Sequence, residues 1–200
     1  MLDGIARKAI DPALEALGSR LAAAGISANA VTIAACLLGI AAATAIALGW
    51  LWLGLALILA SRLGDGLDGV VARSGGATDF GGLLDIVLDF VFYGAIPLGF
   101  VLLDPAANAV AGAVLIFAFY VNGASFLAFS LVAERRGLRS DARGAKSIYF
   151  TTGLAEATET LVVFVAFCIL PGWFAPIAYG FAALTAWTTL SRLVLAARTF

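Results

Sequence analysis

The sequence contains no histidine, and this absence removes several classes of chemistry. Serine–histidine–aspartate triads, cysteine–histidine pairs and zinc sites with imidazole ligands all require that side chain. There are two cysteines, Cys36 and Cys168, and both lie in apolar stretches. We interpret them as small hydrophobic residues of helices and not as a disulfide or a metal pair. Any general base is therefore expected to be a carboxylate.

Charged residues are scarce as well. They make up 12% of the 200 residues, whereas a soluble domain carries about 25%. Hydrophobic residues account for 62% of the chain, and the mean hydropathy is +1.04. No basic run interleaved with aromatics suggests nucleic-acid binding. Residues 1–20 carry charges throughout and lack a compact apolar core, so no cleavable signal is expected. We predict an integral membrane protein with a single domain over residues 1–200.

Long apolar stretches divide this domain into expected transmembrane helices. A spanning helix needs about 20 mainly apolar residues. Residues 21–61 carry no charge and fit two spans, with a turn at residues 49–52. Four further spans are expected at about residues 82–103, 107–133, 148–170 and 173–196. The predicted fold class is therefore all-α, with a six-helix bundle in residues 26–200 preceded by a juxtamembrane amphipathic segment in residues 1–25.

Six spans place both termini on the same side of the membrane. All 12 lysines and arginines then fall on that side or in the adjoining helix ends. The positive-inside rule makes this side cytoplasmic. Trp50, Trp52 and Trp173 lie at the opposite ends of the predicted spans, where interfacial anchors are expected.

The N-terminal segment has the pattern of an amphipathic helix. Asp11 can cap such a helix, with Pro12 at its first position and Gly25 as its stop. Three leucines share one face of it: Leu14, Leu17 and Leu21. The helix is expected either to lie on the membrane surface or to dock on another part of the protein.

Four aspartates lie at ordered spacings within apolar sequence: Asp65, Asp68, Asp85 and Asp89. An ionised aspartate near the bilayer centre costs roughly 2.5–3.5 kcal/mol, so these charges require compensation. Residues three or four apart share a helix face, and the short connection at residues 74–80 makes the two helices antiparallel neighbours. We therefore expect the four carboxylates to converge at the cytoplasmic end of the bundle. Clustered carboxylate oxygens suit Mg²⁺ or Mn²⁺, and their spread is wide enough for two ions.

Glycines accompany the aspartates: Gly64, Gly66, Gly69, Gly81 and Gly82. Those at positions 64–69 allow either close approach of a bulky ligand or tight packing of helices through small residues. The adjacent carboxylates favour the ligand. The pair at positions 81 and 82 opens a span, where free N–H groups and the helix dipole favour phosphate. Arg73 adds a positive charge at the same level.

The acidic segment resembles the signature of the CDP-alcohol phosphotransferases, and every signature position is filled: Asp65, Asp68, Gly69, Ala72, Arg73, Gly81, Asp85 and Asp89. Residues 29–32 are similar to the Pro-Asn-x-x-Thr element of that family, with Ala28 at the proline position. The six-span layout and the preceding amphipathic helix agree with the family, so the resemblance covers essentially the whole chain. Residues 146–160 are similar to a bacterial inner-membrane branch.

The resemblance implies a reaction in phospholipid biosynthesis. A CDP-linked lipid, usually CDP-diacylglycerol, gives its phosphatidyl group to an alcohol and releases CMP. By this match Asp65, Asp68 and Asp85 would hold metal, and Asp89 would be both a ligand and the base. The CDP site would be lined by Asn29, Thr32, Asp68, Gly69, Ala72, Arg73 and Gly81. The resemblance further implies a homodimer in the bacterial plasma membrane, with its active site on the cytoplasmic side.

The acceptor alcohol is less clearly indicated. Phosphorylated acceptors need cations, as in phosphatidylglycerol-phosphate and phosphatidylinositol-phosphate synthases, which are the specific alternatives. Where the inositol-phosphate branch carries such cations, this chain has Ser130, Val132, Ala157 and Thr160, although Arg192 remains. Glu156 and Glu159 would either pair with nearby arginines or contact a polar acceptor, and an acidic pocket suits an amino alcohol. Glutamates also occur at matching positions in relatives that use phosphates.

Two other classes of function stay open at this point. The acidic cluster could serve a small ion-coupled transporter, although transporter sites tend to lie near the membrane midplane. The chain could also be a catalytically idle lipid-binding relative, which the complete set of aspartates argues against.

Overall fold

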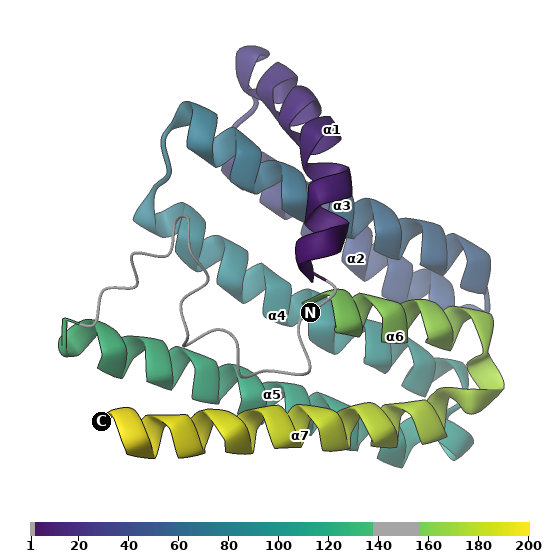
Figure 1. Ribbon diagram of the computed structural model, residues 1–200. Coiled ribbons are helices and arrows are strands. Elements are labelled where there is room, and N and C mark those ends of the chain that lie inside the picture. Colours follow the sequence, from purple (N-terminus) through teal and green to yellow (C-terminus); the bar gives the residue numbers. More distant parts are fainter. Residues whose placement is uncertain (1–2, 138–156) are drawn as a thin grey trace.

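A computed structural model describes residues 3–137 and 157–200, with side chains from residue 11 onward. Within these ranges the chain forms seven α-helices and one short 3₁₀ turn. The elements are α1 (Asp3–Ala23), α2 (Ala28–Ala47), α3 (Leu51–Gly75), α4 (Asp79–Leu103), α5 (Pro105–Arg135), α6 (Ala157–Ile169), η2 (Pro171–Trp173) and α7 (Phe174–Thr199). Helices α2–α7 form a bundle, and α1 crosses the outside of α3 (Figure 1).

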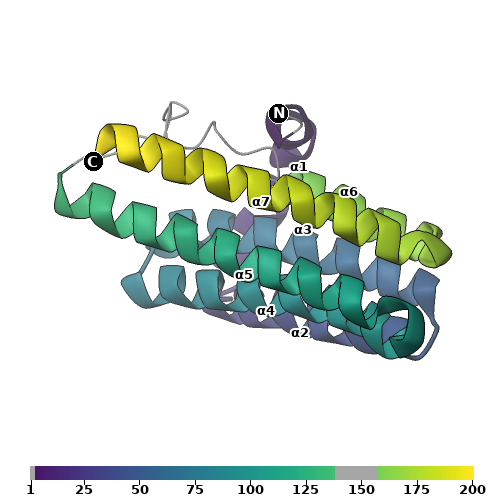
Figure 2. The ribbon, with the colours of Figure 1, turned by 90° about the horizontal axis from the view of Figure 1, so that it is seen from below.

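Two groups of helices make up the bundle. Helix α2 packs against α3 and α4, while α5 packs along α7 (Figure 2). Helix α4 contacts both groups, because it also packs against α5. Long consecutive helices run in opposite directions, so the connection at residues 76–78 lies at the same end as the C-terminus (Figure 1). The four predicted aspartates lie in the halves of α3 and α4 nearer to this end.

The helix ends follow local sequence signals. Gly25 adopts a φ of 78°, and its N–H donates to the Ala22 carbonyl at 3.0 Å, which confirms it as the stop of α1. Gly49, with a φ of 84°, separates α2 from α3 and confirms the predicted turn. Asp104 caps α5 by accepting the N–H of Ala107 at 3.1 Å.

The start of α1 differs from the prediction. The helix begins at Asp3 and runs through Pro12, so the expectation that Asp11 caps it is wrong. A proline removes one intrahelical hydrogen bond, but its fixed φ is helical and the alanine- and leucine-rich flanks favour a helix. Helix α1 docks on α3: Leu14 lies over Gly66, and Gly18 lies against Val70. Docking on another part of the protein, one of the two placements expected for this segment, is therefore observed, and the placement on the membrane surface stays a prediction.

Aromatic side chains fill the centre of the bundle. The fully buried ones are Phe92, Phe100, Phe164, Phe167 and Phe174. Phe100 stacks on Phe174 with ring centroids 5.1 Å apart, and this contact joins α4 to the start of α7. The aromatic core holds α4 in place, and α4 carries two of the four aspartates.

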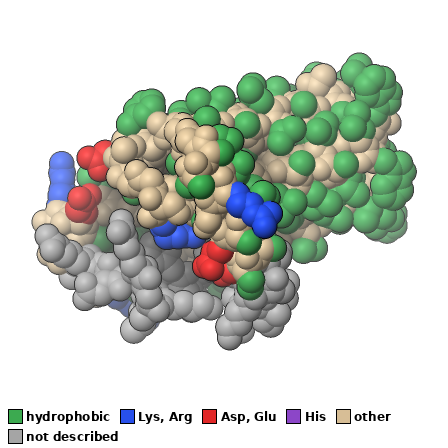
Figure 3. Space-filling model, turned by 90° about the horizontal axis from the view of Figure 1, so that it is seen from above, with side chains coloured by type: hydrophobic (Ala, Val, Ile, Leu, Met, Phe, Trp, Pro, Cys, Tyr) green, Lys and Arg blue, Asp and Glu red, His purple; other side chains and the backbone are tan. Residues whose placement is uncertain are grey.

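The outside of the bundle is apolar. Among the residues that the structure describes, four segments are long and apolar enough to cross a membrane: Ala28–Ala47, Asp79–Leu103, Pro105–Arg135 and Pro171–Thr199. Hydrophobic side chains cover one end of the face in Figure 3, whereas the charged side chains visible there lie toward the other end. The structure is therefore that of an all-helical membrane protein. Six spans remain a prediction, because α3 carries charges and the described part of α6 has 13 residues.

Candidate active site

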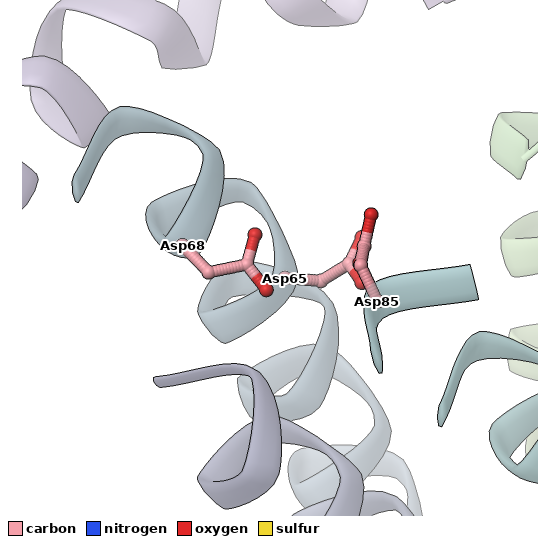
Figure 4. A group of neighbouring side chains, drawn as sticks. All are labelled: Asp65, Asp68 and Asp85. Carbon is pink, nitrogen blue, oxygen red and sulfur yellow. The ribbon is translucent and has the colours of Figure 1, made fainter. Parts of the chain in front are cut away.

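Three of the four predicted aspartates form one group. Asp65 and Asp68 come from α3, and Asp85 comes from α4, with one carboxylate oxygen of each lying within 4.8 Å of the others (Figure 4). The three-residue spacing places the α3 pair on one helix face, and the short connection brings α4 alongside. The predicted convergence is therefore observed for these three residues.

The chemistry of this group fits a divalent cation. Its oxygens are hard ligands from two rigid helices, which is the donor type that Mg²⁺ and Mn²⁺ prefer. Asp68 is 7% exposed, and a buried carboxylate requires a cation or several hydrogen bonds. Asp65, Asp68 and Asp85 could together hold one such ion.

Thr32 on α2 supports this group. Its hydroxyl donates to Asp68 Oδ2 at 2.7 Å, and both side chains are buried. The sequence placed Thr32 in the CDP site. The structure adds that Thr32 orients a carboxylate of the metal group, as outer-shell partners of metal ligands do.

A large cavity opens beside Asp68 and Asp85. Its volume is about 820 Å³, and it lies between the start of α2, the end of α3 and the start of α4. The predicted CDP-site residues that line it are Asn29, Thr32, Asp68, Gly69, Ala72 and Gly81. Arg73 is exposed and does not line the cavity. It lies near the cavity wall, because its Nη1 would be 3.5 Å from a Cβ atom added at Gly69, which does line it. Residues far apart in the sequence thus meet in one nucleotide-sized space.

The glycines near the aspartates serve different purposes. A Cβ at Gly81 would lie 3.0 Å from Asn29 Oδ1, so the glycine allows α4 to approach α2. The Gly81 N–H donates to Thr78 Oγ1 at 3.0 Å and is therefore already engaged, which differs from the expected free N–H. Gly64 faces Ala35 of α2, and Gly66 faces Leu14 of α1.

Of the glycines at positions 64–69, Gly69 alone lines the large cavity. The expectation that all three leave room for a ligand is therefore wrong for Gly64 and Gly66. Because α1 and α2 both lie against α3, these two positions need a side chain small enough for helix packing.

Asp89 lies one helical turn after Asp85 and faces a second cavity of about 320 Å³. The other polar residues that line this second cavity come from four helices: Tyr93, Asn122, Thr160, Thr185 and Arg192. Arg192 Nη1 donates to the Asn122 carbonyl at 3.0 Å and to Asn122 Oδ1 at 2.9 Å, so α5 fixes the arginine of α7.

The residues predicted for the acceptor are only partly brought together. Arg192 lines the second cavity, whereas Ser130 is exposed and lines neither cavity. Glu159 is half-buried on α6, beside Thr160 of the cavity wall, but does not line the cavity itself. Glu156 lies outside the described residues. Asn122 and Thr185 were not predicted, and a polar residue inside a predicted span is the signal that could have found them.

Arg62 is a further residue that the sequence interpretation missed. Its Nη1 lies 2.9 Å from Asp89 Oδ1 and 3.4 Å from Asp65 Oδ1, so one guanidinium bridges α3 and α4. Arg62 precedes Asp65 by three residues, and this spacing alone would have predicted the ion pair.

Comparison with known proteins decides the family. The family model of CDP-alcohol phosphatidyltransferases matches residues 25–196. The chain belongs to the CDP-alcohol phosphatidyltransferase family. The predicted resemblance is thereby confirmed, and family membership explains the acidic residues better than the alternative of a transporter does.

A curated relative and two solved structures resemble this family member. The Inner membrane protein YnjF of Escherichia coli (strain K12) is 43% identical over 193 residues, which cover 96% of this chain and 94% of that protein. Phosphatidylinositol phosphate synthase (PgsA1) of Mycobacterium tuberculosis with CDP-DAG bound superimposes with a TM-score of 0.71. It is 23% identical, with 90% of this chain and 91% of that chain covered.

The same synthase in complex with manganese and citrate also has a TM-score of 0.71, at 23% identity and with coverage of 90% and 87%. At this identity the likeness shows the fold alone. Family membership makes the protein a metal-dependent membrane enzyme that transfers substituted phosphate groups.

Proposed function

We propose that this enzyme transfers the phosphatidyl group of CDP-diacylglycerol, or a similar CDP-linked lipid, to the hydroxyl of an alcohol and releases CMP. One observation carries the proposal: two cavities meet on α4, where Asp85 lines the larger and Asp89 lines the smaller. A single turn of helix thus separates a space for the donor from a space for the acceptor.

The larger cavity is the proposed donor site. Its volume of about 820 Å³ lies within the range of about 300–1,000 Å³ typical of ligand sites. Asn29, Gly69 and Ala72 would contact the nucleotide, with Arg73 beside its phosphates. A structural relative that binds CDP-DAG supports this assignment.

The three-carboxylate group of Asp65, Asp68 and Asp85 is the proposed metal site. A Mg²⁺ or Mn²⁺ ion bound there would neutralise phosphate oxygens and the departing CMP. Thr32 keeps the Asp68 carboxylate oriented for this task. The second ion expected from the sequence would need Asp89 as a further ligand.

Asp89 is the proposed general base. The acceptor hydroxyl would lie in the smaller cavity, within reach of the carboxylate. The oxygen of the acceptor hydroxyl attacks the phosphorus that carries the diacylglycerol group, while the proton of that hydroxyl passes to Asp89. The bond from that phosphorus to the oxygen bridging it to CMP breaks, and CMP leaves with the bonding electrons. A positioned carboxylate contributes about 10²–10⁴-fold to such a step.

The smaller cavity offers hydroxyl and amide groups from Asn122, Thr160 and Thr185, with Arg192 as the cation among the described residues that line it. This lining supports a hydroxylated acceptor. Phosphatidylglycerol-phosphate synthase and phosphatidylinositol-phosphate synthase are the specific alternatives in which Arg192 would contact the acceptor phosphate.

A screen of acceptors tests the function. The purified enzyme is incubated with CDP-diacylglycerol, Mn²⁺ or Mg²⁺ and one alcohol at a time. The alcohols are glycerol 3-phosphate, inositol phosphate, serine, ethanolamine, choline and phosphatidylglycerol. CMP release and a new lipid with one acceptor are expected, together with loss of both when EDTA is added. Absence of CMP release with every acceptor would count against the proposal.

We also propose a topology in which α2–α7 are six spans, both termini are cytoplasmic and the active site faces the cytoplasm. Residues 1–200 then form one domain, with residues 1–25 at the membrane boundary. A thiol reagent added outside the cell should label Trp50→Cys, whereas Arg136→Cys should be labelled only from the cytoplasm. The reverse pattern would overturn this topology. The homodimer in a bacterial plasma membrane remains a prediction, which crosslinking in native membranes checks.

A further inference from the structure

Helix α1 packs against the part of α3 that carries two of the proposed metal ligands (Figure 1). Leu14 lies over Gly66, so that a Cβ atom added at this glycine would be 3.0 Å from Leu14 Cδ1. Gly66 stands between Asp65 and Asp68 in the chain. One turn further along α1, Gly18 contacts α3 as well. Helix α1 therefore lies against the helical turn that presents these carboxylates.

Gly18 makes the closer of the two contacts. A Cβ atom added at Gly18 would lie 2.6 Å from Val70 Cγ1 and 2.7 Å from Val70 Cβ, which is closer than real Cβ atoms approach. Valine is β-branched, so its side chain has little freedom to turn away. Among residues 11–23 Gly18 alone is buried, inside a helix where glycine is unfavourable. The close approach of α3 explains why a glycine occupies this position.

The segment of α3 beneath these contacts is a weak stretch of helix. Gly64, Gly66 and Gly69 all lie in it, and each glycine lowers the intrinsic stability of a helix. The residues of α3 that line the donor cavity include several from the same segment: Asp68, Gly69, Val71 and Ala72. Because the helix is weak here, packing of neighbouring elements must hold the carboxylates and the cavity wall in place.

The end of α1 also forms part of the donor cavity. Ala22 belongs to α1, and it lines the cavity together with Gly25, Ile26 and Ser27 of the short connection to α2. A displacement of α1 from α3 would therefore change the cavity in two ways. It would move the wall formed by residues 22–27, and it would release the turn of α3 that carries the carboxylates.

We propose that α1 sets the geometry of the metal group and of the donor cavity, with Gly18 and Leu14 as the positioning residues. Neither residue lines the cavity or belongs to the group of three carboxylates, so each acts through α3. The effect on metal binding does not depend on which reaction the enzyme catalyses. The effect on KM for the CDP-lipid rests on the proposed function, so the two effects can fail independently.

The test is a titration of the full-length protein in nanodiscs with Mn²⁺ alone, followed by electron paramagnetic resonance. Gly18→Ala should weaken Mn²⁺ binding about 10-fold and Gly18→Leu about 100-fold, because the added atoms push α1 away from Val70. This loss is expected although alanine is the better helix former. Ala16→Leu adds the same bulk on an exposed face of α1 and should leave the affinity unchanged. Unchanged Mn²⁺ affinity in Gly18→Leu overturns the proposal.

A second pair of variants decides the matter if Gly18→Leu does not fold. Gly66→Leu places a large side chain against Leu14 and should weaken Mn²⁺ binding about 10-fold. Adding Leu14→Ala exchanges the large and the small side chain across the contact, and volume-conserving exchanges are tolerated best. The double variant should therefore recover most of the affinity. The same weak binding in the single and the double variant overturns the proposal.

Two further measurements separate positioning from a purely structural role. A structural role would lower the melting temperature of Gly18→Ala and leave its Mn²⁺ affinity unchanged below the melting transition, which would overturn the proposal. In a wild type that releases CMP, Gly18→Ala should raise KM for the CDP-lipid about 10-fold and leave KM for the acceptor unchanged. A change in KM for the acceptor alone overturns the role at the donor cavity. A wild type that binds Mn²⁺ but releases no CMP with any acceptor refutes the proposed function, while the titration still decides the role of α1.

Discussion

The two cavities of this enzyme are built in different ways. The donor cavity is lined mostly by residues 68–85, which belong to one antiparallel helix pair, together with the start of α2. The acceptor cavity draws Asp89, Asn122, Thr160 and Arg192 from four helices. Chemistry common to the family is thus encoded in one short segment. The part that selects the acceptor depends on the packing of α4 against α5, α6 and α7.

The largest effect is expected from the proposed general base, which lines the smaller cavity. Asp89→Asn should lower CMP release by about 10²–10⁴-fold, because the amide cannot accept the acceptor proton. The melting temperature should fall, because Arg62 loses a partner 2.9 Å away, so activity is compared below the melting transition of both proteins. Asp104→Asn is the matched control, since asparagine also caps helices and Asp104 lies at the other end of the bundle. Full activity in Asp89→Asn would remove Asp89 as the base.

The next largest effect is expected on metal binding beside the donor cavity. Thr32→Val removes the hydroxyl that donates to Asp68, and a lost outer-shell partner weakens metal binding by about 10–100-fold. Titration with Mn²⁺ measures this change. Thr44→Val, at an exposed position on the same helix, should leave the affinity unchanged. Equal affinities for all three proteins would show that Thr32 does not support the metal site.

A substitution beside the acceptor cavity should change KM for the acceptor without changing KM for the donor. Asn122→Leu removes one side-chain oxygen that holds Arg192, and KM for the acceptor should rise about 10-fold, or ~1.4 kcal/mol. KM for the CDP-lipid should not change. The sequence interpretation placed Ser130 near the acceptor, but this residue is exposed and lies outside the cavity. Ser130→Ala should therefore leave KM for the acceptor and KM for the CDP-lipid unaltered. A rise in the donor KM alone for Asn122→Leu would reverse the assignment of the cavities.

The smallest effect is expected at the contact between α2 and α4. Gly81→Ala places a methyl group 3.0 Å from Asn29 Oδ1, and relieving that contact costs about 1 kcal/mol. KM for the CDP-lipid should therefore rise about fivefold, with KM for the acceptor unchanged. Gly94→Ala adds a methyl group on the same helix where no atom lies within 4 Å, and should be neutral.

The sequence was sufficient for the donor side because its signals are local. The spacings of Asp65, Asp68 and Asp85 on neighbouring helices determine that their carboxylates meet. The glycine at position 25, which lines the donor cavity, determines where α1 ends. Even here Gly66 was misinterpreted, because its role depends on α1 docking over it, a contact between residues far apart in the chain.

The acceptor side could not be predicted in the same way. Asn122 and Arg192 are 70 residues apart, and nothing local indicates that α5 packs along α7. Arg62 was counted among the cations that set topology, although its partner Asp89 lies 27 residues away on another helix. Its other partner, Asp65, is three residues away and was within reach of sequence reasoning.

Donor and acceptor are proposed to occupy separate cavities, one lined by Asp85 and the other by Asp89. A cryo-electron microscopy or crystal structure with CDP-diacylglycerol and Mn²⁺ tests this proposal most directly. We expect the cytidine and its phosphates in the cavity between α2, α3 and α4, Mn²⁺ at Asp65, Asp68 and Asp85, and an acceptor cavity free of nucleotide. Cytidine bound in the cavity beside Arg192 would contradict it.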